Sequence, residues 1–123
     1  LGDVYKRQVY MSSVYVNNLI INSGSDFSQS FTINGVEDNS SYDLTGFTVT
    51  AQMRKYSGSS SYTSFVTTIV NPPTLGKIIL SLPASTTVSL KPGRYVYDVI
   101  IEKNSYKTRV LEGMVLVREG VTR

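Results

Sequence analysis

Two carboxylates are the residues of this sequence best suited to chemistry. Asp98 lies inside the strongly β-forming run YVYDVII at residues 95–101, and Glu112 lies in the apolar run that follows it. Neighbouring strands would bring the two side chains together, and paired carboxylates can serve as general acid and base. The chain of 123 residues has no His and no Cys, which excludes imidazole bases, thiolate nucleophiles and any Ser-His-Asp triad. A hydrolase in this chain would therefore have to use Asp98 and Glu112.

A structural role explains Asp98 better than catalysis does. Its neighbours on the same face of the strand are Val96 and Ile100, so partial burial is expected. An arginine such as Arg109 or Arg94 would then pair with the carboxylate. Since no second acid lies close in sequence, nothing completes a catalytic constellation, and we expect no catalytic residues.

Oxygen ligands cluster between residues 37 and 43. Glu37, Asp38, Asn39 and Asp43 are the residue types that bind Ca²⁺. Their spacing fits no EF-hand loop, and a solvated loop with Asx-type turns explains them better. We expect neither a metal site nor a cofactor.

Three tyrosines form a candidate contact surface. Tyr56, Tyr62 and Tyr106 lie in predicted loops, where flat rings can stack on sugars. Trp, the strongest stacking residue, is absent. A concave patch that gathered the three rings would favour sugar binding.

The charge pattern argues against nucleic acid as a partner. Lys and Arg total 12 against 9 Asp and Glu, and the formal charge is +3. The basic residues are dispersed, whereas a nucleic-acid footprint concentrates them on one element. Arg54-Lys55 beside Tyr56, and Lys107 beside Tyr106, are explained equally well by a solubilising surface. No stretch approaches the roughly 18 apolar residues of a membrane span, so no membrane partner is expected.

Short apolar runs separated by Gly, Pro, Asn, Asp and Ser clusters predict the elements that must position these residues. The clearest strand is residues 47–54, where Phe, Val, Ala and Met alternate with Thr, Gln and Arg. The other predicted strands are residues 14–21 with a bulge or kink at Asn17-Asn18, residues 26–33, 62–70, 78–82, 94–102 and 108–118. A short helical turn capped by Ser85 is expected within residues 84–90.

These spacings predict an all-β protein, an immunoglobulin-like antiparallel β-sandwich of about seven strands. Residues 55–61 are expected to form an exposed hairpin loop, and residues 103–105 a tighter one. The Asn34-Gly35 pair is a turn signal, followed by a polar loop.

The first ten residues are expected to be a translation artefact. DVYKRQ at residues 3–8 is one reading frame of a transposon end that is joined to DNA fragments in sequencing libraries. Met11 would then be the natural start, and residues 11–123 a single domain. The source implied is an environmental metagenome.

An ordered series of motifs resembles a known family. It comprises DLTGF at residues 43–47, GKIILSL at 76–82, LKPGRYVYDV at 90–99 and RVLEGMVLV at 109–117. The series resembles small virion structural proteins of tailed bacteriophages, notably phages of marine cyanobacteria, and more distantly the N-terminal β-sandwich of siphophage upper baseplate proteins. The likeness spans residues 11–123.

The resemblance implies a non-enzymatic virion building block of a tail, baseplate, neck or capsid surface, made in the host cytoplasm. Its partners would be other virion proteins or further copies of itself, docked through loops or an open strand edge such as residues 14–21. A carbohydrate-binding module that recognises host surface glycans is the alternative function. The family offers no catalytic residues, and the matched residues are those of turns and strands: Asp43, Gly46, Gly93, Tyr95, Tyr97 and Asp98.

Overall fold

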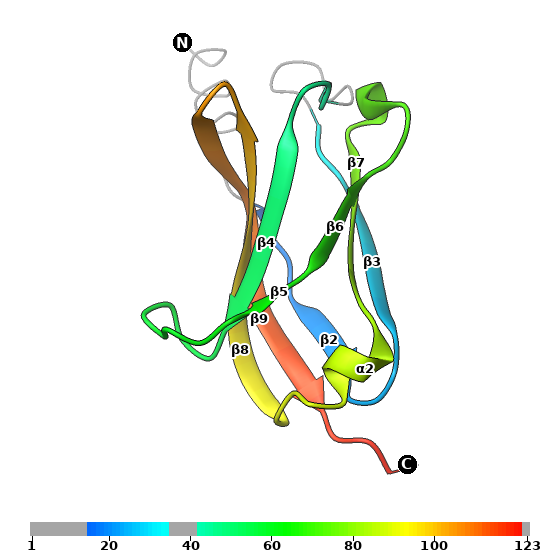
Figure 1. Ribbon diagram of the computed structural model, residues 1–123, viewed down its shortest axis with the longest axis vertical. Coiled ribbons are helices and arrows are strands. Elements are labelled where there is room, and N and C mark those ends of the chain that lie inside the picture. The colour runs from blue at the N-terminus through cyan, green and yellow to red at the C-terminus, as the bar shows by residue number, and fades with distance from the viewer. Residues whose placement is uncertain (1–14, 35–41, 122–123) are drawn as a thin grey trace.

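The computed structural model describes residues 15–34 and 42–121, which form two β-sheets packed face to face (Figure 1). In chain order the elements are β1 (Tyr15–Val16), β2 (Leu19–Asn22), β3 (Phe27–Thr32), β4 (Thr48–Arg54), β5 (Thr63–Ser64), β6 (Val66–Ile69), the 3₁₀ helix η1 (Pro73–Leu75), β7 (Lys77–Leu82), the short helix α2 (Ala84–Thr87), β8 (Gly93–Lys103) and β9 (Tyr106–Arg118). The predicted all-β class is confirmed. The expected artefact at residues 1–10, the turn at Gly35 and the acidic residues 37 and 38 lie outside the described residues.

The strand order is that of an immunoglobulin-like sandwich. The larger sheet has the order β1-β9-β8-β4-β5, with β2 also paired to β9, and the smaller sheet has the order β3-β7-β6. Immunoglobulin constant-type domains place strands A, B, E and D in one sheet and C, F and G in the other. Here β3, β7 and β6 take the places of B, E and D, while β4, β8 and β9 take those of C, F and G.

One pairing departs from the predicted antiparallel sandwich. β1 and β2 pair with β9 in parallel, with Tyr15 opposite Leu111 and Leu19 opposite Val115. The chain enters alongside β9, running in the same direction as that last strand, and reverses only after Asn22 to enter the smaller sheet as β3. The expected first strand is therefore an edge of the larger sheet.

The predicted interruption at Asn17-Asn18 is confirmed, and three contacts shape it. The Tyr97 hydroxyl donates to the Asn17 carbonyl oxygen at 2.6 Å. The Asn18 side-chain oxygen accepts from the Met114 backbone N–H at 3.0 Å, which replaces a ladder bond. Gly113 lies directly beneath, because a Cβ there would collide with the Asn17 carbonyl oxygen. The first strand can lie this close alongside β9 only because residue 113 has no side chain.

The predicted strand at residues 62–70 is divided between the two sheets. β5 pairs with β4 in the larger sheet, and β6 pairs with β7 in the smaller one. Phe65 lies between them, buried in the core, with its ring centroid 5.9 Å from that of Phe27 and 6.1 Å from that of Tyr97. The chain passes from the larger sheet to the smaller one at Phe65, and burial of this ring between the sheets accompanies the passage. Figure 1 shows β5 and β6 in front of the sandwich.

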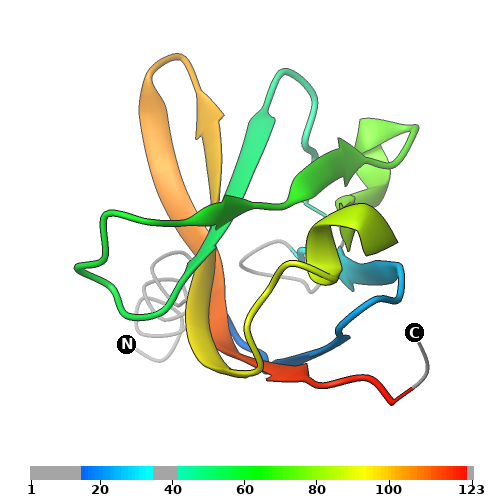
Figure 2. The ribbon, with the colours of Figure 1, turned by 60° about the horizontal axis from the view of Figure 1, so that its bottom comes forward.

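The short helix closes one end of the sandwich, as Figure 2 shows. Thr87 is its buried residue, and its hydroxyl donates to the Ser25 carbonyl at 2.8 Å while accepting from the Gly24 N–H at 3.1 Å. The expected cap by Ser85 is wrong, because Pro83 occupies the N-cap. The Asp26 carboxylate instead accepts from the Ala84 N–H at 2.7 Å, and this bond and those of Thr87 hold the helix in place.

Alternation along the strands builds one core between the sheets. Inward side chains of β2, β4, β8 and β9 in the larger sheet meet those of β3 and β7 in the smaller one. The most deeply buried of them are Ile21, Leu44, Met53, Ile78, Leu80, Val99, Val115 and Val117.

The matched residues Asp43 and Gly46 lie in a turn, and Gly93, Tyr95, Tyr97 and Asp98 lie in β8. The Asp43 carboxylate accepts from the Thr45 hydroxyl at 2.6 Å and from its N–H at 2.9 Å, and these bonds lower the pKa of that carboxyl. Gly46 follows in the same turn with a φ of +81°. Beyond Gly93, at the start of β8, the Tyr95 hydroxyl donates to the Lys91 carbonyl at 2.7 Å, the arrangement called a tyrosine corner.

We expect Tyr97→Phe to lower the free energy of unfolding by about 1 kcal/mol at pH 7, because the Asn17 carbonyl loses its donor. Burial raises the pKa of Tyr97 from 10.0 to about 12. The folded state therefore holds this proton more tightly than the unfolded state does. The difference stabilises the wild type below pH 10, and this stabilisation is lost as the pH rises toward about 12. Urea unfolding of the wild type and of Tyr97→Phe from pH 8 to 11.5 measures the difference between their free energies of unfolding. A difference that stays constant over this range would contradict the assignment.

We expect Gly113→Ala to cost at least about 2 kcal/mol, because the new methyl group collides with the Asn17 backbone. Gly58→Ala is the matched control. A Cβ at residue 58 meets only the Tyr56 ring at 3.9 Å, so its effect should stay within about 0.5 kcal/mol. Chemical unfolding of the two variants and the wild type measures the loss of stability in each variant. Equal stabilities would show that Gly113 does not position the first strand.

Candidate functional site

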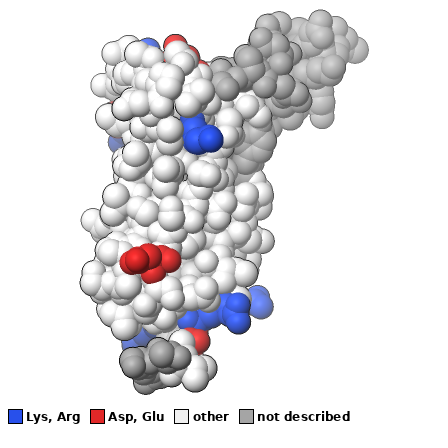
Figure 3. Space-filling model, turned by 90° about the vertical axis from the view of Figure 1, so that its right-hand side faces the viewer, with Lys and Arg blue, Asp and Glu red and all other residues white. Residues whose placement is uncertain are grey.

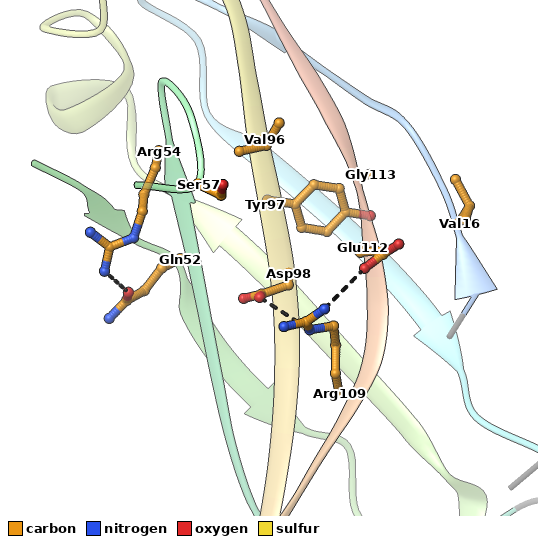
Figure 4. Close-up of a pocket in the computed structure, with 10 residues that line it drawn as sticks. All are labelled: Val16, Gln52, Arg54, Ser57, Val96, Tyr97, Asp98, Arg109, Glu112 and Gly113. Atoms are coloured by element: carbon orange, nitrogen blue, oxygen red, sulfur yellow. Dashed lines mark hydrogen bonds and ion pairs between the residues drawn. The ribbon is translucent and has the colours of Figure 1, made fainter. Parts of the chain in front are cut away.

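The outer face of the larger sheet carries a shallow hollow of about 360 Å³ (Figure 4). It lies over β1, β4, β8 and β9, and the loop after β4 forms part of its wall. Its lining residues are Val16, Gln52, Arg54, Ser57, Val96, Tyr97, Asp98, Arg109, Glu112 and Gly113. Outward side chains of neighbouring strands therefore supply both apolar and charged groups to one surface.

The two carboxylates singled out in the sequence do lie together. The register places Asp98 directly opposite Glu112 on neighbouring strands. Arg109 lies between them, with its Nε 3.4 Å from the Asp98 carboxylate and its Nη1 3.4 Å from that of Glu112 (Figure 4). The predicted pairing of Asp98 with an arginine is confirmed, and Arg109 rather than Arg94 is that arginine.

A β-bulge brings Arg109 to this position. The β8–β9 register shifts between Val99 and Ile100, so that Val99 faces Leu111 while Ile100 faces Arg109. The extra residue, Val110, is buried, and the strand alternation resumes with Arg109 on the outer face. The bulge thus places the guanidinium beside both acids.

This cluster has the properties of a surface charge network. The side chain of Asp98 is 37% exposed and that of Glu112 is 44% exposed. Both acids share one cation, whereas a general base that works through desolvation is a buried carboxylate without such a partner. Among the described residues, no group of three or more candidate ligands gathers to hold a metal ion.

An apolar cluster lies beside the charged residues. Ile20 and Leu116 are direct neighbours in register, as are Met114 and Val96, and Val16 flanks Glu112. Their exposed fractions run from 37% for Val96 to 71% for Val16. We call these five residues the outer-face apolar cluster. Contiguous exposed apolar surface of this kind marks sites of protein contact.

The loop after β4 is anchored to the sheet through Arg54. Its guanidinium donates to the Gln52 side-chain oxygen at 2.9 Å and to the Ser59 carbonyl, and lies 4.7 Å from the centroid of the Tyr62 ring. Lys55 lies 4.9 Å from the centroid of the Tyr95 ring. These cation–π contacts occupy one face of each ring, which leaves less ring surface for a sugar.

The three predicted contact tyrosines are exposed but do not gather. Tyr56 and Tyr62 lie near Arg54, at one end of β4. Tyr106 is 74% exposed and begins β9 opposite Lys103, beyond the pairing of Glu102 with Thr48 at the other end of β4. No single concave patch of the described residues contains all three rings.

The outer-face apolar cluster is the feature that sequence reasoning missed. Ile20, Val96, Met114 and Leu116 each lie beside a core residue in the chain, so each belongs to an apolar run that burial alone explains. The signal was available in β9, where Met114, Val115, Leu116 and Val117 form an unbroken apolar stretch. A strand that is apolar on both faces has both faces covered in the functional assembly, or presents one to a partner.

Comparison with known proteins finds a likeness of fold and no likeness of sequence. No protein-family model matches the sequence, and no curated protein matches it. Within the described residues, no helix is long and apolar enough to cross a membrane.

Two solved structures resemble the chain. The N-terminal domain of phage TP901-1 ORF48 matches with a TM-score of 0.50 and 11% identity, over 83% of this chain and 85% of that one. InlP of Listeria monocytogenes matches with a TM-score of 0.46 and 16% identity, over 83% of this chain but only 26% of that one. The chain thus spans about a quarter of the InlP structure. At these identities the likeness is one of fold, a β-sandwich shared with a domain of a phage protein.

We expect Arg109→Gln to lower the free energy of unfolding by less than about 1 kcal/mol, because exposed ion pairs contribute little. The loss should shrink in 1 M NaCl, where repulsion between the two opposed carboxylates is screened. Arg94→Gln is the control, since Arg94 forms no ion pair in the part of the chain that is described. Thermal unfolding at low and high salt measures both, and an equal loss in the two variants would contradict the network.

Proposed function

We propose that this domain is a non-enzymatic structural module of a tailed-phage virion that docks onto other virion proteins. The outer-face apolar cluster is the observation that carries the proposal. Val16, Ile20, Val96, Met114 and Leu116 present apolar side chains to solvent on a regular sheet, and burial against a partner would remove this surface from water.

The charged residues beside the cluster suit a docking surface. An interface combines an apolar centre with a polar rim, and its arginines are frequent contributors to affinity. Arg54, Arg109 and Glu112 lie next to the cluster, where they can orient a partner and exclude others. The polar rim thus supplies specificity, and the apolar cluster supplies affinity.

Two kinds of likeness support the virion as the location. The motif series at residues 43–47, 76–82, 90–99 and 109–117 resembles small phage structural proteins. The sandwich itself is similar in fold to the N-terminal domain of phage TP901-1 ORF48. Tail, baseplate, neck and capsid surface are the virion positions that such a module serves.

The test begins with purified particles of the phage that carries this gene. Quantitative mass spectrometry should find the chain in the particles at a fixed ratio to the major capsid protein. Cross-linking within the particle should place a neighbouring virion protein next to β9. Presence only in the infected-cell lysate, and not in particles, would overturn the proposal.

We expect Met114→Lys to prevent incorporation into particles, because it places a charge in the centre of the apolar cluster. Met114 is 43% exposed, so the isolated variant should keep its stability to within about 0.5 kcal/mol. Thr50→Lys is the matched control, because Thr50 is exposed on the same sheet away from the cluster. The variants are compared by their amounts in purified particles relative to the capsid protein, and equal incorporation would exclude this face as the docking site.

Glycan binding is the alternative function, and a glycan array on the wild-type chain addresses it. The separation of Tyr106 from Tyr62 leaves no common platform for one sugar chain within the described residues. A specific glycan signal that is lost in Tyr62→Ala would favour this alternative over docking.

A further inference from the structure

β3 forms an open edge of the smaller sheet. The Ile33 N–H donates to the Gly76 carbonyl, on the side of β7, at 2.7 Å. Backbone groups alternate sides along a strand, so those of Phe27, Gln29 and Phe31 also point toward β7. The N–H and C=O groups of the intervening residues, Ser28, Ser30 and Thr32, therefore point away from the sheet. Of these, the Ser30 carbonyl accepts a long bond of 3.4 Å from the Gln29 side-chain amide, which a pairing strand would replace.

Within the described residues, no other strand covers this edge. In the four-stranded sheet of a constant-type immunoglobulin domain, strand A lies beside strand B. Here the first strand is paired with β9 in the other sheet, and β3, in the place of strand B, is left at the edge. The place of one strand in the smaller sheet is therefore open to a partner.

This edge lacks the features that usually protect an exposed strand. Natural edges carry lysines, prolines or bulges that prevent pairing with another chain. β3 has the sequence FSQSFT, without charge or proline, and its register with β7 is regular over six residue pairs. Asp26 precedes it, and Lys77 lies across from its last residue.

The surface next to the edge is uncharged as well. Ser28 and Ser30 lie beside Ser81 and Ile79 of β7, which in turn lie beside Val66 and Thr68 of β6. Figure 3 faces this side of the molecule and shows a broad surface without Lys, Arg, Asp or Glu between the few charged groups toward its ends. Two such surfaces can approach each other without repulsion between like charges.

We propose that β3 pairs with β3 of a second copy of this chain, antiparallel about a two-fold axis at Ser30. In this register Ser30 faces Ser30 of the second copy, and Ser28 faces Thr32. The outward N–H and C=O groups of each opposed pair exchange two hydrogen bonds, and the two three-stranded sheets become one continuous sheet.

The second copy is favoured as the occupant because the edge is complementary to itself. A two-fold interface presents the same surface twice, so each residue must suit its symmetry mate. Hydroxyl side chains face hydroxyl side chains along the pair, and such Ser and Thr pairs are favourable in sheets. Asp26 falls opposite Asn34, so no like charges oppose each other directly. The pairing does not depend on the virion role proposed above, because it uses the other sheet.

The test uses Ser30→Lys and Ser30→Glu in the full chain, measured by sedimentation velocity over a concentration series. The wild type should shift from monomer to dimer as its concentration rises. Each variant alone should associate at least about tenfold more weakly, because identical charges meet at the two-fold axis. An equimolar mixture of the two variants should regain dimers, because the introduced lysine of one copy then faces the introduced glutamate of the other. This recovery also shows that both variants are folded.

Two controls assign the outcome to the edge. Thr68→Lys adds the same charge to the same outer face, two strands away, and should leave association unchanged. Met114→Lys alters only the face proposed for docking and should also leave it unchanged. A wild type that stays monomeric at all concentrations overturns the proposal, as does association that survives in Ser30→Lys and Ser30→Glu alike. Loss of dimers in Met114→Lys alone would assign self-association to the larger sheet instead.

Discussion

The close parallel pairing of the first strand with β9, beside Gly113, is the contact on which the rest of this sandwich depends. Two short strands, β1 and β2, precede β3 in the described residues, and both pair with the same edge of the larger sheet. The Tyr97 hydroxyl, the Asn18 side chain and the absence of a Cβ at residue 113 hold them against β9. Because both strands are committed there, the larger sheet gains an apolar edge and the smaller sheet keeps an open one.

The two sheets therefore present surfaces of different chemistry. The larger sheet presents apolar side chains beside a compact charge network, and its affinity for a partner would come from side chains. The smaller sheet presents hydroxyl groups beside outward-pointing backbone groups, and its affinity would come from main-chain hydrogen bonds. A small module with two such surfaces can contact a second copy through one sheet and a different protein through the other.

Several cations of the described residues stabilise the structure. Arg109 bridges two opposed carboxylates, Arg54 anchors a loop, and Lys55 lies against the ring of Tyr95. These pairings place cations where like charges or exposed rings would otherwise lie. They also explain why the carboxylates that first suggested chemistry sit in the middle of a network rather than in a desolvated pocket.

Local patterns in the sequence determined the strands, the fold class, the turn at Asp43 and the interruption at Asn17-Asn18, because two-residue alternation and turn propensity act between near neighbours. Only the tertiary structure decided which edge the first strand would pair with, that Arg109 rather than Arg94 would reach Asp98, and that Tyr106 would lie apart from Tyr62. It also divided residues 62–70 between the sheets and left β3 uncovered. These outcomes depend on register, on a bulge and on contacts between residues far apart in the chain, and no local pattern encodes them.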